Sequence, residues 1–121
     1  EDDLMGLAKR RVAQITAAGK AERIGVLVSS KPGQRATTVA ETLRARFEEK
    51  GREAVIIYLD EVRAEHLNNF VEAEAFIDTA CPRLAVDGVS GVDRPILTVR
   101  EAEVVLGERR WEDIWGDGYL G

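Results

Sequence analysis

The hydrophobic residues of this chain alternate between helical spacing and short continuous runs. From Leu4 to Ala18 apolar residues recur every three or four positions, and Gly19 follows them. This spacing predicts an amphipathic helix that ends at the glycine. Its apolar stripe consists of Leu4, Ala8, Val12 and Ile15, and its expected solvated face of Lys9, Arg10, Arg11 and Gln14.

Two apolar runs flank the next helical pattern. Ile24–Val28 has no polar alternation, which is typical of a strand buried on both faces of a parallel sheet. From Ala36 to Lys50 the apolar residues share one helical face, and Gly51 is the kind of residue that commonly closes a helix. The second run, Ala54–Leu59, comes next. Strand, helix and strand in this order predict a βαβ unit.

Shorter elements follow in the second half of the chain. We expect a short polar helix over Arg63–Asn69, a third strand over Ala75–Ile77 and a fourth short strand over Pro95–Leu97. A helix over Thr98–Gly107 and an aromatic tail packed on the body, over Trp111–Tyr119, should follow. Thr98 and Glu101 have the spacing of a capping box that opens this helix. The sequence therefore predicts one three-layer α/β domain over residues 1–121. Its short, mainly parallel sheet lies near residues 24–29, 54–59 and 74–78, with helices on both faces.

Composition narrows the classes of partner and compartment. The 121 residues carry a formal net charge of −5, which argues against a nucleic-acid binder and favours a protein partner or a small ligand. A single cysteine excludes an internal disulfide, and no apolar stretch approaches the roughly 20 residues that span a bilayer. We therefore expect a cytoplasmic protein without membrane contact. Because the chain starts at Glu1, directly at a helix, we also expect it to be a fragment of a longer protein.

Polar residues follow each of the first three predicted strands. In an open parallel sheet, ligands bind outside the carboxyl ends of the strands, so these residues should share one rim. We expect the edge of a pocket there to be lined by Ser30, Lys31, Gly33, Gln34 and Asp60. Arg83 has two interpretations: its guanidinium could pair with a carboxylate, either that of Asp78 or that of a ligand, or its side chain could pack against a helix.

The loop from Lys31 to Gln34 has two interpretations. Lysine, proline and glycine are ordinary turn residues, and the same loop could cradle an anionic or nucleoside-like ligand with its backbone amides. It does not have the spacing of a Walker loop, and no G-x-G-x-x-G motif occurs in the chain.

Cys81 follows the third predicted strand and has three interpretations. It could be a small buried core residue, a phosphatase-type thiolate or a metal ligand. The phosphatase motif requires an arginine six positions later, but residue 87 is Asp. A metal site requires further ligands, and the only histidine, His66, lies in a polar helical stretch where we expect solvent exposure. Because Pro82 restricts the preceding backbone, we expect the thiol to lie beyond the strand, partly accessible and unpaired.

Four segments together resemble the last domain of archaeal diphthamide synthases. They are Ser29–Gln34, Leu59–Glu61, Ala75–Leu84 and Pro95–Thr98. The resemblance extends from about Arg11 to Asp117, and its specific part is the run Asp-Thr-Ala-Cys-Pro-Arg at residues 78–83.

This resemblance implies a homodimeric transferase whose subunit has three related α/β domains. Each domain would contribute one cysteine to a single 4Fe-4S cluster, which leaves one iron free for S-adenosylmethionine, and Cys81 matches the third of these ligands. The family releases a 3-amino-3-carboxypropyl radical from S-adenosylmethionine, and this radical adds to a histidine of translation elongation factor two. That reaction is the first step of diphthamide biosynthesis. This chain alone, with one cysteine, is expected neither to hold an intact cluster nor to catalyse the reaction.

Two other functions are compatible with the residues alone. One is a non-catalytic α/β module for ligand binding or dimerisation, in which the cysteine is structural. The other is a cysteine-dependent hydrolase, which is disfavoured because no histidine is placed as a base. Two further cysteines at domain-length intervals upstream in the parent gene would favour the transferase.

Overall fold

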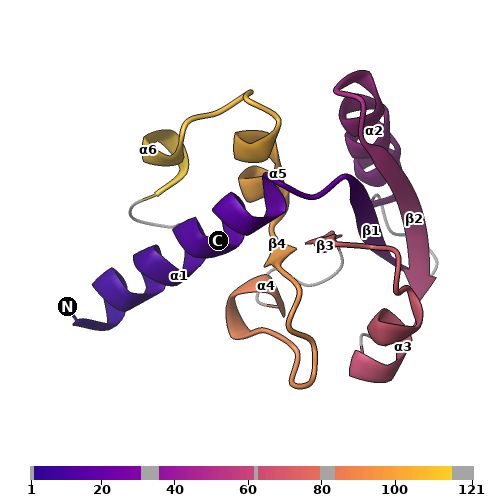
Figure 1. The fold of residues 1–121 in the computed structure, drawn as a ribbon, viewed down its shortest axis with the longest axis horizontal. Helices are drawn as coiled ribbons and strands as arrows, with labels where there is room; N and C mark the ends of the chain where they lie inside the picture. Colours follow the sequence, from indigo (N-terminus) through magenta and orange to yellow (C-terminus); the bar gives the residue numbers. More distant parts are fainter. Residues whose placement is uncertain (1, 31–35, 62, 80–83, 116–121) are drawn as a thin grey trace.

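The computed structural model describes residues 2–30, 36–61, 63–79 and 84–115 of the chain. Helices and strands alternate along it until two helices follow one another at the end, as Figure 1 shows. They are α1 (Asp2–Ala18), β1 (Arg23–Ser29), α2 (Ala36–Glu49), β2 (Glu53–Leu59), α3 (Ala64–Asn69), β3 (Ala75–Asp78), α4 (Leu84–Asp87), β4 (Ile96–Leu97), α5 (Val99–Val105) and α6 (Trp111–Ile114).

The four strands form one parallel sheet in the order β2-β1-β3-β4. The central strand β1 pairs with β2 along its whole length, from Arg23 opposite Glu53 to Ser29 opposite Leu59. On its other side β1 pairs with β3, and Leu27 lies opposite Asp78. The predicted α/β architecture with a mainly parallel sheet is confirmed, and within the described residues the pairing is wholly parallel.

Alternating side chains divide the core between the two faces of the sheet. On the face that we call the α2 face, Val26, Val28 and Ile77 pack with residues of α1, α2 and α5. On the opposite face, the α3 face, Leu27 and Phe76 pack with residues of α3 and α4. Helices therefore cover both faces, as the three-layer prediction requires. The cover is uneven, because α3 has six residues and α4 has four.

Gly25 is required by the close packing on the α3 face. A Cβ atom at this position would lie 2.9 Å from Cδ1 of Ile57 and 3.0 Å from Cδ1 of Phe76. The missing side chain lets these two residues close over the central strand. A larger residue would force both of them to move, which a well-packed core resists.

A buried ion pair ties α1 to the other end of the chain. Arg11 donates from Nε and Nη2 to the carboxylate of Glu101 in α5, at 2.8 and 2.6 Å. It also donates to the carbonyl oxygens of Ala85, at 2.9 Å, and Ile96, at 2.8 Å. Arg11 is 3% exposed and Glu101 is fully buried. Buried charges require this degree of pairing, because desolvation costs several kcal/mol per ion.

Side chains of α1 also cover the outer edge of the sheet at β4. The backbone N–H of Ile96 donates to Oε1 of Gln14 at 3.2 Å, while its carbonyl accepts the bond from Arg11. These two side chains satisfy the backbone groups that a further strand would otherwise pair with. The expected solvated face of this helix is thus wrong at both positions. Val12, assigned to the apolar stripe, is exposed instead.

The capping box at the start of α5 is confirmed. Glu101 donates its backbone N–H to Oγ1 of Thr98 at 3.1 Å, and its carboxylate accepts the Thr98 N–H at 2.9 Å. The carboxylate of Glu101 therefore serves both the helix cap and the ion pair with Arg11.

Some elements differ from the sequence-based expectation. The helix α4 was not predicted, β3 extends one residue past Ile77 to Asp78, and α2 ends at Glu49, one residue before Lys50. In the predicted aromatic tail, α6 covers four residues, and the ring of Trp111 stacks on that of Trp115 with centroids 5.1 Å apart. The end of this tail lies outside the described residues.

Replacing Arg11 by Met should destabilise the domain strongly. The variant leaves the Glu101 carboxylate buried without its counter-ion, and breaking such a pair typically costs about 3–5 kcal/mol. The free energy of unfolding in urea measures this loss. Arg44→Met is a matched control, because Arg44 pairs with Glu41 on an exposed helical surface, and its loss should stay within about 0.5 kcal/mol. Adding Glu101→Gln to Arg11→Met should restore part of the stability. Equal losses in Arg11→Met and Arg44→Met would contradict this role.

Candidate functional site

The carboxyl ends of β1 and β2 meet at one rim of the sheet. Ser30, the first residue after β1, donates its backbone N–H to the carbonyl of Leu59 at 3.0 Å. Its hydroxyl donates to the carboxylate of Asp60, the first residue after β2. Both side chains are exposed. The structure thus brings together two of the predicted site residues, and their role in binding stays a prediction.

Charges next to this pair are partly balanced. Arg63 donates from Nε and Nη2 to the two carboxylate oxygens of Glu61, at 3.1 Å each. This hydrogen-bonded guanidinium lowers the pKa of the Glu61 carboxyl, while the neighbouring Asp60 acts in the opposite direction. Glu61 is therefore ionised and neutralised by Arg63, whereas the Asp60 carboxylate accepts a neutral hydroxyl.

The end of β3 is fixed to the central strand by a threonine. Thr79 donates both its backbone N–H, at 3.1 Å, and its hydroxyl, at 2.6 Å, to the carbonyl of Leu27. Directly before it, Asp78 is buried at the last position of the strand. The chain then leads toward Cys81. Sequence reasoning did not single out Thr79, because its partner Leu27 lies 52 residues away in the chain.

The remaining predicted site residues lie outside the described part of the chain. They are Lys31, Gly33, Gln34, Cys81 and Arg83. Their assignments, including the accessibility of the thiol and the partner of the guanidinium, stay predictions.

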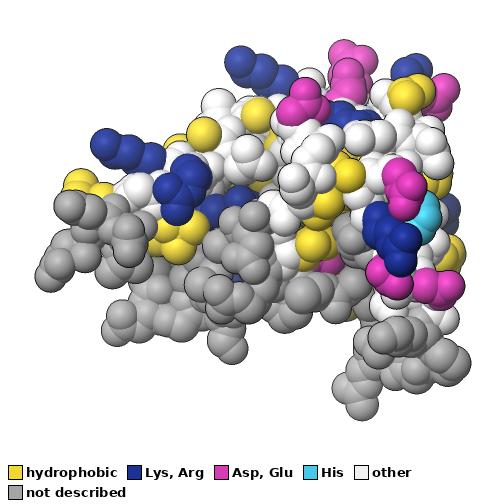
Figure 2. All heavy atoms as spheres, turned by 90° about the horizontal axis from the view of Figure 1, so that it is seen from below, with side chains coloured by type: hydrophobic (Ala, Val, Ile, Leu, Met, Phe, Trp, Pro, Cys, Tyr) yellow, Lys and Arg dark blue, Asp and Glu magenta, His cyan; other side chains and the backbone are white. Residues whose placement is uncertain are grey.

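His66 differs in part from its expected solvent exposure. Its side chain is half-buried, and Nδ1 is buried without a hydrogen bond to the described residues. The neighbouring Leu67 enters the core of the α3 face, which draws this side of the helix inward. Figure 2 shows the histidine beside acidic and basic side chains on the surface.

The described residues contain no group of three or more His, Cys, Asp or Glu side chains that could hold a metal ion. Among the described helices, none is long and apolar enough to cross a membrane.

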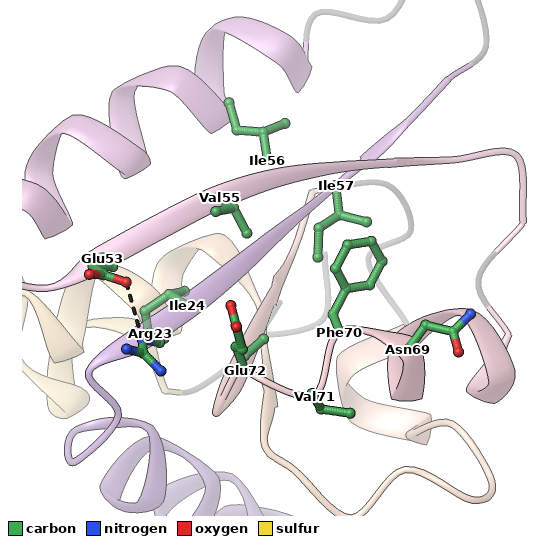
Figure 3. Close-up of a pocket in the computed structure, with 11 residues that line it drawn as sticks. Arg23, Ile24, Glu53, Val55, Ile56, Ile57, Asn69, Phe70, Val71 and Glu72 are labelled. Carbon is green, nitrogen blue, oxygen red and sulfur yellow. Dashed lines mark hydrogen bonds and ion pairs between the residues drawn. The ribbon is translucent and has the colours of Figure 1, made fainter.

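A groove lies at the other end of the sheet, near the starts of the strands (Figure 3). We call it the β2 groove; its cavity volume is about 340 Å³. It is lined by Arg23 and Ile24 of β1, by Glu53, Val55, Ile56 and Ile57 of β2, and by the segment Asn69–Ala73. Sequence reasoning missed this groove, because it depends on β2 being an edge strand.

Comparison with known proteins adds a family to this geometry. The family described as "Putative diphthamide synthesis protein" matches residues 1–116. This chain belongs to that family. The resemblance noted from four segments of the sequence is thereby confirmed.

Relatives in the diphthamide synthesis family carry an enzyme name. The chain is 37% identical over 113 residues to 2-(3-amino-3-carboxypropyl)histidine synthase of Pyrococcus horikoshii. This match covers 93% of this chain and 32% of that protein. It is 32% identical over 102 residues to subunit 1 of the synthase of the same name from Gallus gallus, covering 84% and 25%. The chain thus spans about a third or less of the length of these relatives.

A solved structure in the family has the same fold. The crystal structure of Dph2 from Pyrococcus horikoshii with a 4Fe-4S cluster superposes with a TM-score of 0.80 at 35% sequence identity. The match covers 88% of this chain and 31% of that one.

Replacing Thr79 by Val should weaken the anchor at the end of β3. The hydroxyl bond to Leu27 is lost in a partly buried place, and such a bond contributes about 0.5–1.5 kcal/mol. Thr79→Ser keeps the hydroxyl and serves as the control, with a smaller loss in the free energy of unfolding. Equal stability of the Val variant and the parent protein would show that the backbone bond alone fixes this position.

Proposed function

We propose that this chain is the domain of a 2-(3-amino-3-carboxypropyl)histidine synthase that supplies one cysteine ligand to a 4Fe-4S cluster. The observation that carries the proposal is the meeting of strand ends at one rim. Ser30 bonds to Asp60, and Thr79 is fixed to the central strand just before the segment that leads to Cys81. The family membership and the relatives' names support the assignment.

The donor set of the chain fits a shared cluster site. Iron-sulfur clusters are held by several cysteine thiolates, and this chain contains a single cysteine. Cys81 would therefore be one ligand among those from three related domains of a longer subunit. When bound, the cluster would supply one electron to the sulfonium of S-adenosylmethionine, so that one C–S bond would break to give the 3-amino-3-carboxypropyl radical and methylthioadenosine.

The residues of this chain bind and position S-adenosylmethionine in the proposed enzyme. The carboxylate of Asp60 accepts hydrogen bonds from ammonium or hydroxyl donors, both of which this cofactor has. The hydroxyl of Ser30 holds that carboxylate in place. The amides of the segment with Lys31, Gly33 and Gln34 cradle the ligand. Arg83 pairs with a carboxylate, either that of Asp78 or that of the methionine part.

The partners follow from the same assignment. The protein substrate is translation elongation factor two, whose histidine receives the 3-amino-3-carboxypropyl group in the first step of diphthamide biosynthesis. The full-length enzyme is a cytoplasmic homodimer, and the 121-residue chain without the other cysteine-bearing domains is inactive. Neither nucleic acid nor a membrane takes part.

Replacing Cys81 by Ser in the full-length enzyme tests the central assignment. A lost or degraded cluster is expected, because a serine hydroxyl does not replace a thiolate ligand. Transfer to elongation factor two should fall by more than roughly tenfold, since even residues that only support metal ligands affect activity by about 10–100-fold. Anaerobic reconstitution, electron paramagnetic resonance and a transfer assay measure both effects.

The matched control for this variant is Ser90→Ala, which changes an exposed side chain in another loop. Circular dichroism should show the α/β fold in both variants. A normal cluster and normal transfer in Cys81→Ser would mean that the cysteine is structural and that the proposed function is wrong.

Replacing Asp60 by Asn should weaken the binding of S-adenosylmethionine. A hydrogen bond to a charged group contributes about 1.5–3 kcal/mol, so the Kd should rise by roughly 10- to 100-fold. Isothermal titration of the reconstituted full-length enzyme measures this change. Glu61→Gln is the control, because Arg63 already occupies the Glu61 carboxylate. The pocket assignment is wrong if Asp60→Asn binds S-adenosylmethionine as tightly as Glu61→Gln does.

A further inference from the structure

The β2 groove exposes apolar side chains at the end of the sheet opposite to the rim. Val71 is 79% exposed, Val55 is 52% exposed and Phe70 is 40% exposed. Beneath them, the buried Ile57 and Ala73 belong to the core of the α3 face. Figure 3 shows the ring of Phe70 beside Ile57 and the side chain of Val55 on the same side of β2. A contiguous apolar surface of this kind marks an interaction site more often than scattered single residues do.

The cover of β2 is one-sided. The helix α2 packs against β2 on the α2 face, where Ala54 is buried. On the α3 face, Val55 stays half exposed. Parallel sheets occur almost only with both faces covered. The exposed α3 face of β2 therefore lacks the cover that is usual for such a sheet.

Arg94 holds the segment Asn69–Ala73, which forms one wall of the groove, in place. Its Nη1 atom donates to the carbonyls of Phe70, at 2.8 Å, and Ala73, at 2.7 Å. Its Nη2 atom donates to the carbonyl of Leu67 at 3.1 Å and to the Asn68 side chain at 2.8 Å. The same guanidinium lies over a phenylalanine ring of β3, 4.8 Å from its centroid.

Glu74, the residue directly after the lining segment Asn69–Ala73, also fixes this segment to the rest of the domain. The carboxylate of Glu74 accepts the backbone N–H groups of Glu22, at 2.6 Å, and Arg23, at 3.2 Å. The bond from Glu22 and, to a smaller extent, the bond from Arg23 lower the pKa of the Glu74 carboxyl, which stays ionised at neutral pH. Val71 and Phe70 are therefore presented outward by a fixed segment, and such preorganisation lowers the entropic cost of binding.

We propose that the β2 groove seats an amphipathic helix from another domain of the same full-length subunit. About two thirds of the Pyrococcus horikoshii relative lies outside the region that this chain matches, so the full-length protein has ample chain to supply it. The groove opens on the face of a sheet, against which a helix packs its apolar stripe.

The rim of the groove defines the chemistry of that helix. Arg23 is paired with Glu53 at 3.1 Å, whereas Glu72 adds a further exposed carboxylate. The helix therefore has a stripe of branched aliphatic residues bordered by a lysine or arginine next to Glu72. The histidine of the protein substrate must reach the rim at the carboxyl ends of the strands, which is the end of the sheet opposite to the groove.

Hydrogen exchange in the full-length enzyme and in the 121-residue chain tests the proposal. The shorter chain is the reference, because its described residues form clusters of buried side chains on both faces of the sheet. Amides of residues 69–74 should exchange at least tenfold more slowly in the full-length enzyme. Val71→Lys should abolish most of this slowing, and it should shift the Tm of the shorter chain by less than about 3 °C, as surface substitutions do. Val55→Thr, which keeps a β-branched residue in the strand, should reduce the slowing less.

The matched control is Val12→Lys, which introduces the same charge at another exposed valine and should leave the slowing intact. Equal exchange rates in the two proteins would overturn the proposal. Slowing in the 121-residue chain that rises with concentration would also overturn it and would assign the groove to a second copy. Slowing that requires added elongation factor two would overturn it in favour of the substrate. Exchange depends on neither the cluster nor the transfer reaction, so the proposed function and this proposal can fail separately.

Discussion

The ion pair between Arg11 and Glu101 joins residues 90 positions apart and holds the β4 side of the domain together. One guanidinium binds the start of α5, the carbonyl of Ala85 in α4 and the outer edge of β4 through Ile96. Gln14 completes the same edge. Because all of these groups are buried or half-buried, the first helix cannot leave without exposing several unpaired polar atoms. The sheet is thereby closed on one side by α1, while β2 is left as its other edge.

Periodicity was sufficient to predict most elements of the fold. Continuous apolar runs located β1 and β2, and the spacing of Thr98 and Glu101 located the start of α5. The same reasoning failed for Arg11, because a helical wheel places a charged residue in solvent and does not know of a carboxylate 90 residues away. The four residues of α4 are too few for a helical period to be recognised.

The candidate site was predictable to the extent that topology fixes it. Parallel strands bring their carboxyl ends to one edge, which is sufficient to place Ser30 next to Asp60. The two bonds from Thr79 to Leu27 depend on strand order, which apolar runs do not reveal. The β2 groove exists because no described helix covers Val55 on the α3 face. The hydrophobic pattern of the sequence does not show which parts of a sheet stay uncovered.

The parallel sheet also sets the distance between the β2 groove and the rim at the carboxyl ends of its strands. The seven residues of β2 extend over roughly 20 Å, at about 3.3 Å per residue, with the groove near one end and the rim at the other. With a helix seated in the groove as proposed, the sheet acts as a lever arm pivoted there. A tilt of about 5° at the pivot would move the rim by roughly 2 Å. Misplacement of about 1 Å is enough to slow a reaction that depends on alignment. If this domain supplies a cluster ligand as proposed, contacts at the far end of the sheet would then set how accurately the rim is placed.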